Sequence, residues 1–153
     1  MPADIQILES LELFNDLSSD ELEEIAGFME PVKVSEGEML ARRKDTAHTF
    51  FITLSGNYMI SFEEGRAFTI HGKGDVIGMS TVIAPFQFQS TTIALTEGEV
   101  LSMPGSKLLE LIQGNSYLGD RIMHRLHDIA AQRAWYIKGF PEQEESKDQV
   151  ESL

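Results

Sequence analysis

Cysteine is absent from all 153 residues of the sequence. This absence excludes disulfide bonds, thiolate metal sites and cysteine nucleophiles together. The sequence also has no apolar run long enough to cross a bilayer, so no membrane partner is expected. Its start, Met1-Pro2-Ala3-Asp4, lacks the basic and then apolar regions of a secretory signal. The simplest interpretation is a cytoplasmic protein.

Positive charge is scarce in this chain. It has 12 lysines and arginines against 25 aspartates and glutamates, which gives a formal net charge of -13. A nucleic-acid interface needs a basic face that displaces counterions. No nucleic-acid partner is therefore expected, and the charge is typical of a surface that maintains solubility.

Patterns of catalytic residues are missing as well. The sequence contains no nucleophile-elbow and no P-loop motif. Its many serines and carboxylates form no recognisable catalytic constellation. We therefore predict no catalytic residues and expect that the chain is not an enzyme.

The first thirty residues show helical patterns. Ser18-Ser19-Asp20-Glu21 is a capping box, with Ser18 as the N-cap and Glu21 at the third helical position. The apolar residues that follow at helical spacing are Leu22, Ile25, Ala26 and Met29. Pro31 is expected to end this helix.

Between residues 32 and 103 the pattern changes to short apolar or alternating runs separated by glycine-containing turns. The predicted strands are 32–34, 39–41, 50–54, 58–62, 67–70, 91–94 and 100–103. Ser55-Gly56-Asn57 and Glu63-Glu64-Gly65 are expected to connect hairpins. Many short strands with such turns indicate a β-sandwich or barrel.

Helical periodicity returns after Pro104. A short helix is predicted around residues 108–112, and a longer one runs from about residue 117 to 138. The apolar stripe of the longer helix is Leu118, Ile122, Leu126, Ile129, Ala130, Ala134 and Ile137. Ile122, Leu126 and Ile129 lie close to the spacing of a two-stranded helical seam. Residues 141–153 form an acidic tail that we expect to be disordered.

A glycine-flanked turn, Gly74-Asp75-Val76-Ile77-Gly78, is followed eleven residues later by the polar run 89–94. The turn continues into Met79-Ser80-Thr81. Such a turn can direct several backbone N–H groups at one anion, and the returning strand would add an amide and hydroxyls. This arrangement predicts an anion pocket.

The order of helices, barrel, short helix and long helix resembles the cyclic nucleotide-binding domain over residues ~8–138. Several motifs carry this resemblance: Phe14…Leu17-Ser18…Glu21-Leu22, Glu36-Gly37-Glu38-Met39-Leu40, Phe51-Ile52…Ser55-Gly56 and the turn 74–78. It implies a mainly β fold, a double-stranded β-helix (jelly-roll) barrel of about eight strands with N-terminal helices and a long C-terminal helix. We assign residues 1–140 to this domain, expected to stand alone because few residues follow it.

The resemblance also implies a ligand site, with two departures. In the family a Glu follows the second glycine of the cassette and holds the ribose, and an Arg pairs with the cyclic phosphate. Here these positions carry Met79 and Gln89. The expected ligand is a cyclic nucleotide (cAMP or cGMP) or another small anion, bound weakly or in an altered way. The predicted ligand-binding residues are Gly78, Met79, Ser80, Thr81, Gln89, Ser90, Thr91 and Trp135.

Aromatic residues surround this predicted site. Trp135 lies where the family places a lid over the base, although packing on the barrel or on a second subunit is an equal alternative. Phe86 and Phe88 are interpreted as filling the space of a nucleotide or as covering an apolar ligand, with ordinary core packing as the default alternative. Arg121, Arg125, Arg133 and Lys138 give the long helix a positive face, which we interpret as either solvated or able to reach an acidic ligand.

The leading hypothesis is therefore a regulatory or sensor domain. Family members often dimerise through the long helix, so a homodimer is expected. One alternative is a ligand-free module that binds a partner protein or a second copy. A further alternative is a cupin-type metalloenzyme, whose barrel is similar, but its His-x-His metal motif is missing among His48, His71, His124 and His127. No metal site is predicted.

Overall fold

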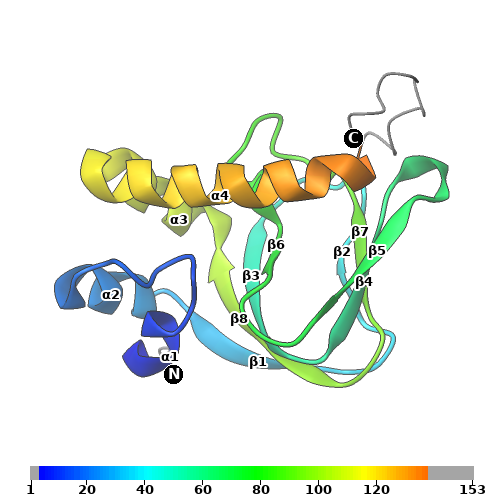
Figure 1. The fold of residues 1–153 in the computed structure, drawn as a ribbon, viewed down its shortest axis with the longest axis horizontal. Helices are drawn as coiled ribbons and strands as arrows, with labels where there is room; N and C mark the ends of the chain where they lie inside the picture. Colours follow the sequence, from blue (N-terminus) through cyan, green and yellow to red (C-terminus); the bar gives the residue numbers. More distant parts are fainter. Residues whose placement is uncertain (1–3, 138–153) are drawn as a thin grey trace, which may run out of the picture.

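The computed structural model describes residues 4–137, without the side chains of Glu64 and of residues 134–137. The predicted acidic tail, 141–153, and the predicted domain end at residue 140 lie outside the described residues. Two short helices precede eight strands, and two further helices follow them within the described range (Figure 1). The helices are α1 (Ile5–Glu9), α2 (Ser19–Ala26), α3 (Gly105–Gly114) and α4 (Ser116–Ile137).

The strands form two four-stranded antiparallel sheets that face each other. They are β1 (Glu30–Val34), β2 (Met39–Ala41), β3 (Thr49–Ser55), β4 (Asn57–Ser61), β5 (Ala67–His71), β6 (Val76–Ile77), β7 (Thr91–Ala94) and β8 (Gly98–Pro104). One sheet has the order β1-β8-β3-β6 and the other β2-β7-β4-β5. The predicted mainly β, jelly-roll class with flanking helices is confirmed, and α4 lies along one side of the barrel in Figure 1.

Local sequence features explain where the N-terminal elements begin and end. The predicted capping box is present: the Ser18 side chain accepts from the Glu21 N–H at 3.2 Å, and the Glu21 carboxylate accepts from the Ser18 N–H at 2.8 Å. The prediction that Pro31 ends this helix is wrong, because α2 ends at Ala26. Pro31 instead lies in β1, an edge strand, where a missing N–H donor is tolerated.

One of the two predicted hairpins is confirmed. A 3-10 turn at Glu63–Gly65 joins β4 to β5, which pair with each other. The prediction for Ser55-Gly56-Asn57 is wrong, because β3 and β4 belong to different sheets. Gly56, with φ of +99°, turns the chain sharply from one sheet to the other, and a Cβ there would lie 3.0 Å from the Glu97 carbonyl oxygen. The strand β6 was not predicted, because a strand of two residues is too short to show an alternating pattern.

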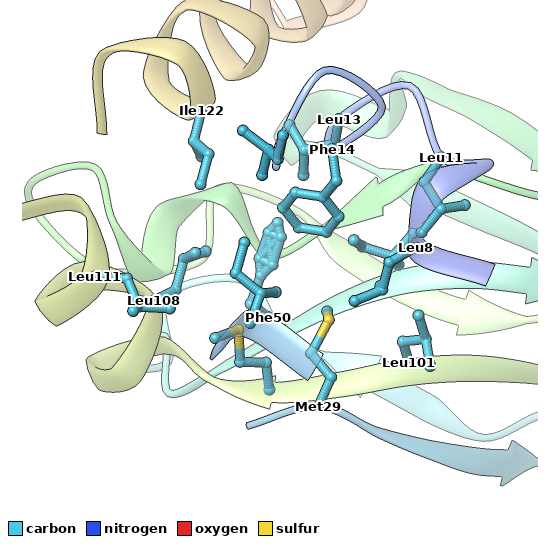
Figure 2. Packing of buried hydrophobic residues seen from close by; sticks show 14 of the residues in the cluster. Leu8, Leu11, Leu13, Phe14, Met29, Phe50, Leu101, Leu108, Leu111 and Ile122 are labelled. Atoms are coloured by element: carbon cyan, nitrogen blue, oxygen red, sulfur yellow. The ribbon is translucent and has the colours of Figure 1, made fainter. Parts of the chain in front are cut away.

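The larger hydrophobic core lies between the barrel and the helices that cover it. Figure 2 shows Phe14 and Phe50 at its centre, with leucines from α1, from the segment after it and from α3 around them. A smaller core lies between the sheets and is built around Tyr58, Ile60 and Phe62. Beside this second core the barrel interior contains an open cavity, which Ile60 and Phe62 help to line.

The long helix α4 is anchored to the N-terminal part of the chain. Leu118, Ile122 and Leu126 are all 0% exposed and belong to the larger core. Arg125 forms an ion pair with Asp16, and its guanidinium also donates to the Glu12 carbonyl at 2.6 Å. None of the helices described within residues 4–137 is long and apolar enough to cross a membrane.

These contacts correct the argument for a helical dimer seam. Ile122 and Leu126 pack inside their own chain, and Ile129 is half-buried against the same core. They do not present the solvent-facing stripe that a two-stranded seam requires. A homodimer stays a prediction, and it would have to use other residues.

Leu126→Ala tests this anchoring. Removal of a fully buried leucine leaves a cavity, so we expect the free energy of unfolding to fall by about 2–5 kcal/mol. The loss should be the same at low and high protein concentration in urea denaturation, because the cavity lies within one chain. His124→Ala, on an exposed position of the same helix, should stay within about 0.5 kcal/mol of the parent. A loss that depends on concentration would restore the dimer seam.

Candidate ligand-binding site

The candidate site is a cavity of about 320 Å³ between the inner face of one sheet, the loop after β6 and the helix α4. Most of its lining is apolar, which is typical of small-molecule pockets with a few placed polar groups. The lining residues are Ala41, Ile60, Phe62, Gly78, Met79, Ser80, Ile83, Ala84, Pro85, Phe88, Gln89, Ser90, Thr92, Ala130 and Arg133. The cavity therefore joins segments that are far apart in the sequence.

Glycine at position 78 sets the turn that forms one wall. Its φ is +91°, and a Cβ there would lie 2.7 Å from the Thr49 carbonyl oxygen. The single 3-10 turn Met79–Thr81 follows, and the Thr81 N–H donates back to the Gly78 carbonyl at 3.0 Å. Among the described residues the N–H groups of Met79 and Ser80 have no protein acceptor, so they remain available to an anion.

The facing strand β7 lines the cavity with Thr92 and not with the predicted Thr91. Side chains alternate along a strand, and Thr92 is the threonine that lines the pocket. Thr91 does not line it, because its hydroxyl accepts from the Arg43 N–H at 3.0 Å instead. Gln89 is exposed at the rim, where its amide donates to the Gln87 carbonyl at 3.2 Å.

The structure thus brings together five of the eight predicted ligand residues: Gly78, Met79, Ser80, Gln89 and Ser90. Thr81 lies elsewhere, buried against Gly105, where a Cβ on that glycine would come within 2.5 Å of the threonine. Trp135 belongs to α4, but its side chain is outside the described residues. Its predicted role as a lid therefore stays a prediction.

The prediction that two phenylalanines fill the nucleotide space is wrong for Phe86. This side chain is 40% exposed, at a residue with φ of +63°. The segment turns outward because it pairs with the loop before β3: the Ala47 N–H donates to the Phe86 carbonyl at 2.8 Å, and the Lys44 N–H donates to the Phe88 carbonyl at 2.9 Å. Phe88 lines the cavity wall, and the cavity stays open.

Arg133 is the basic side chain among the lining residues. It comes from α4, is half-buried, and lies over the Phe68 ring at 5.6 Å from the ring centre. Burial lowers the pKa of Arg133 from its ordinary value, and the Asp75 carboxylate opposes this shift. An arginine remains protonated in proteins, so the cavity carries one fixed positive charge.

Asp75, in the cassette turn, faces a neighbouring cavity of about 130 Å³ that Arg133 also lines. Burial raises the pKa of Asp75, and the neighbouring Arg133 and His71 side chains only partly offset this effect. Within residues 4–137 no ion pair to Arg133 is formed. The guanidinium is therefore available to a ligand in the larger cavity.

Comparison with known proteins now assigns the family. The sequence profile of the cyclic nucleotide-binding domain matches residues 31–115, more than half of the chain. The chain belongs to the cyclic nucleotide-binding domain family. No curated protein sequence matches it.

Solved structures agree on the fold. A protein from Geobacter metallireducens GS-15, described as cyclic nucleotide-binding, superposes with a TM-score of 0.79 at 20% identity, covering 86% of this chain and 98% of that one. The sensor domain of the transcriptional regulator DNR from Pseudomonas aeruginosa superposes with a TM-score of 0.69 at 20% identity, and the match covers 86% of this chain and 96% of that domain. The regulatory subunit of a cAMP-independent protein kinase A from Trypanosoma brucei has a TM-score of 0.69 at 17% identity. This match covers 83% of this chain and 46% of the subunit.

Within this cyclic nucleotide-binding domain, the unusual residues cluster at the ligand cavity. Met79 and Gln89, where Glu and Arg are expected, both line it. Arg133 lies beyond the matched range 31–115. The sequence showed only a cationic helix face there, and nothing in the spacing distinguished Arg133 from Arg121 and Arg125, which bind the N-terminal segment.

Metal chemistry receives no support from the described part of the domain. Within residues 4–137 no group of three histidines or carboxylates is placed to hold an ion. His124 and His127 are exposed on α4, and the His71 ring lies 2.6 Å from the Asn57 side-chain oxygen. The groups that converge on the cavity suit binding of an anion.

Gly78→Ala tests the conformation of the cassette turn. A Cβ adds a left-handed backbone strain of about 1–2 kcal/mol and a contact with the Thr49 carbonyl, so we expect a larger loss of stability than strain alone gives. Gly37→Ala is the matched control, since Gly37 has φ of +86° but nothing within 4 Å of its added Cβ. Equal losses in thermal unfolding would show that the close contact at Gly78 is unimportant.

Proposed function

We propose that this cyclic nucleotide-binding domain is a regulatory sensor whose cavity binds a small anionic ligand through Arg133 and the turn at Met79 and Ser80. The observation that carries the proposal is that a cation of α4 and free N–H groups of the cassette turn line one cavity. A phosphate or carboxylate group suits this pair, because charge-assisted hydrogen bonds are the strong ones.

We expect cAMP and cGMP to bind weakly. A charge-assisted hydrogen bond contributes about 1.5–3 kcal/mol and a neutral one about 0.5–1.5. Gln89 in place of an arginine should thus lower phosphate affinity by one or two decades, at about 1.4 kcal/mol per decade. Met79 adds a second loss, since a thioether accepts a ribose hydroxyl poorly. Arg133 offsets part of the first loss from the opposite wall.

The regulatory step we propose is a change in the position of α4. A ligand held between the barrel turn and Arg133 would bind best when α4 lies close to the barrel, and would therefore favour that position. The core contacts of Leu118, Ile122 and Leu126 hold the first part of α4 fixed. Movement would be greatest toward its far end, where Arg133 and Trp135 lie.

One structural relative supports the idea of altered ligand recognition. It is the regulatory subunit of a kinase described as cAMP-independent. A mutant of that subunit, with a threonine-to-arginine change among its substitutions, is bound to cAMP. In this chain, too, we propose that loss of cationic and acidic ligand residues has changed the ligand while the fold remains.

Arg133→Gln should remove the ligand response. A thermal-shift screen with cAMP, cGMP and cyclic dinucleotides identifies any compound that raises Tm by linkage. In the variant we expect at least a tenfold weaker response, because the charge-assisted bond is lost.

Lys33→Gln provides the control for this experiment, since it removes one exposed positive charge on β1. It should leave the ligand response unchanged. If no anion at millimolar concentration stabilises the parent protein, the ligand-free interaction module is the better description, and its partner would be a protein or a second copy. If both variants respond alike, Arg133 has no special part in binding.

Gln89→Arg should strengthen binding of a cyclic nucleotide by about one to two decades, since it returns a cation to the cavity rim. Isothermal titration with cAMP and cGMP measures the change. Gln113→Arg, an exposed position of α3 that lines neither this cavity nor the hollow beside Gln89, gives the same net charge and should change the affinity little. An unchanged affinity in Gln89→Arg would place the phosphate elsewhere.

A further inference from the structure

A second hollow, of about 330 Å³, lies on the outer side of Gln89. It shares Phe62, Phe88 and Gln89 with the cavity that Arg133 lines, so these residues form a wall between the two. The rest of its lining consists of Arg43, Lys44, Glu63, Arg66 and Gln87. We call this hollow the basic groove, after Arg43, Lys44 and Arg66.

The charge of the basic groove is opposite to that of the chain. The sequence has 12 basic residues against 25 acidic ones, yet three basic side chains line this one hollow and Glu63 is the acidic member of its described lining. Like charges that converge repel each other, and an anion between them removes that repulsion. The groove is therefore suited to a ligand of negative charge.

Arg43 gives independent evidence for a missing partner. Its backbone N–H donates to the Thr91 hydroxyl at 3.0 Å, which fixes the base of the side chain beside β7. Its Nε is buried but has no hydrogen-bond partner among the described residues. Buried polar groups in folded proteins nearly always have partners, and a buried donor without one is costly. An acceptor supplied by a ligand would satisfy it.

The opposite wall of the groove is held in place by backbone pairing. The Lys44 N–H donates to the Phe88 carbonyl and the Phe88 N–H donates to the Asp45 carbonyl, both at 2.9 Å. The cationic loop and the aromatic wall are thus fixed to each other. A site of this kind is organised before the ligand arrives, which lowers the entropic cost of binding.

We propose that the basic groove is a second anion-binding site, which takes a phosphate group through the guanidinium of Arg43 with the ammonium of Lys44 beside it. Phosphate suits this site because an arginine fork presents parallel N–H donors that match two phosphate oxygens. The site is separate from the Arg133 cavity, and the two meet at the Phe62, Phe88 and Gln89 wall.

The test uses inorganic pyrophosphate as the probe, on the full chain at low salt, with NMR of the arginine Nε–H groups. We expect the Arg43 Nε–H resonance to shift and to saturate in the millimolar range or below. Arg43→Gln should weaken pyrophosphate binding about tenfold or more in isothermal titration. Arg43→Lys, which keeps the charge but not the fork, should recover part of this loss.

One control variant separates binding in the groove from binding to a neighbouring charge. Arg42→Gln removes the same charge from the adjacent exposed residue, which does not line the groove, and should bind pyrophosphate as the parent does. The proposal is overturned if Arg42→Gln weakens binding as much as Arg43→Gln does, or if millimolar pyrophosphate does not shift the Arg43 resonance.

Discussion

The burial of one face of α4 against the N-terminal helices and the barrel is the interaction on which the candidate site depends. Leu118, Ile122 and Leu126 are completely buried in the larger core. They fix the rotation of the helix about its axis, because side chains three and four residues apart share one face. Arg133, two turns after Leu126, is thereby directed to the cavity, while the exposed His124 and His127 point to solvent.

Charge at the cavity is arranged differently from the arrangement expected for the family. The cassette turn keeps its glycine conformation and its available N–H groups, whereas Gln89, in the segment before β7, occupies the position expected to supply a cation. A cation reaches the same space from α4, and a second group of cations gathers outside the rim. In a chain of net charge -13, both places offer an anion nearby positive charge.

The sequence predicted the architecture well because its patterns are local. The capping box, the period of α4 and the alternation in β4 and β7 each arise from neighbouring residues. The failures concern contacts between distant segments. Pairing of β3 with β8 rather than with β4, and the outward position of Phe86, follow from partners that spacing does not show.

The same distinction explains which site residues were predicted. Gly78, Met79 and Ser80 lie within one motif and were found together. Thr92 was missed in favour of Thr91 because a one-residue change in strand register exchanges the faces. Arg133 reaches the candidate site and Arg43 reaches the basic groove only through the folding of remote segments, and no pattern in their own neighbourhoods marked them.

The ion pair between Arg125 and Asp16 joins residues 109 positions apart. A contact of such range forms late, since closing a long loop carries an entropic cost that must precede the gain. The barrel sheets can pair before α4 is in place, but the wall that carries Arg133 cannot. A chain still emerging from the ribosome would therefore lack the wall that α4 supplies, and the candidate site would be complete only after α4 had packed against the N-terminal segment.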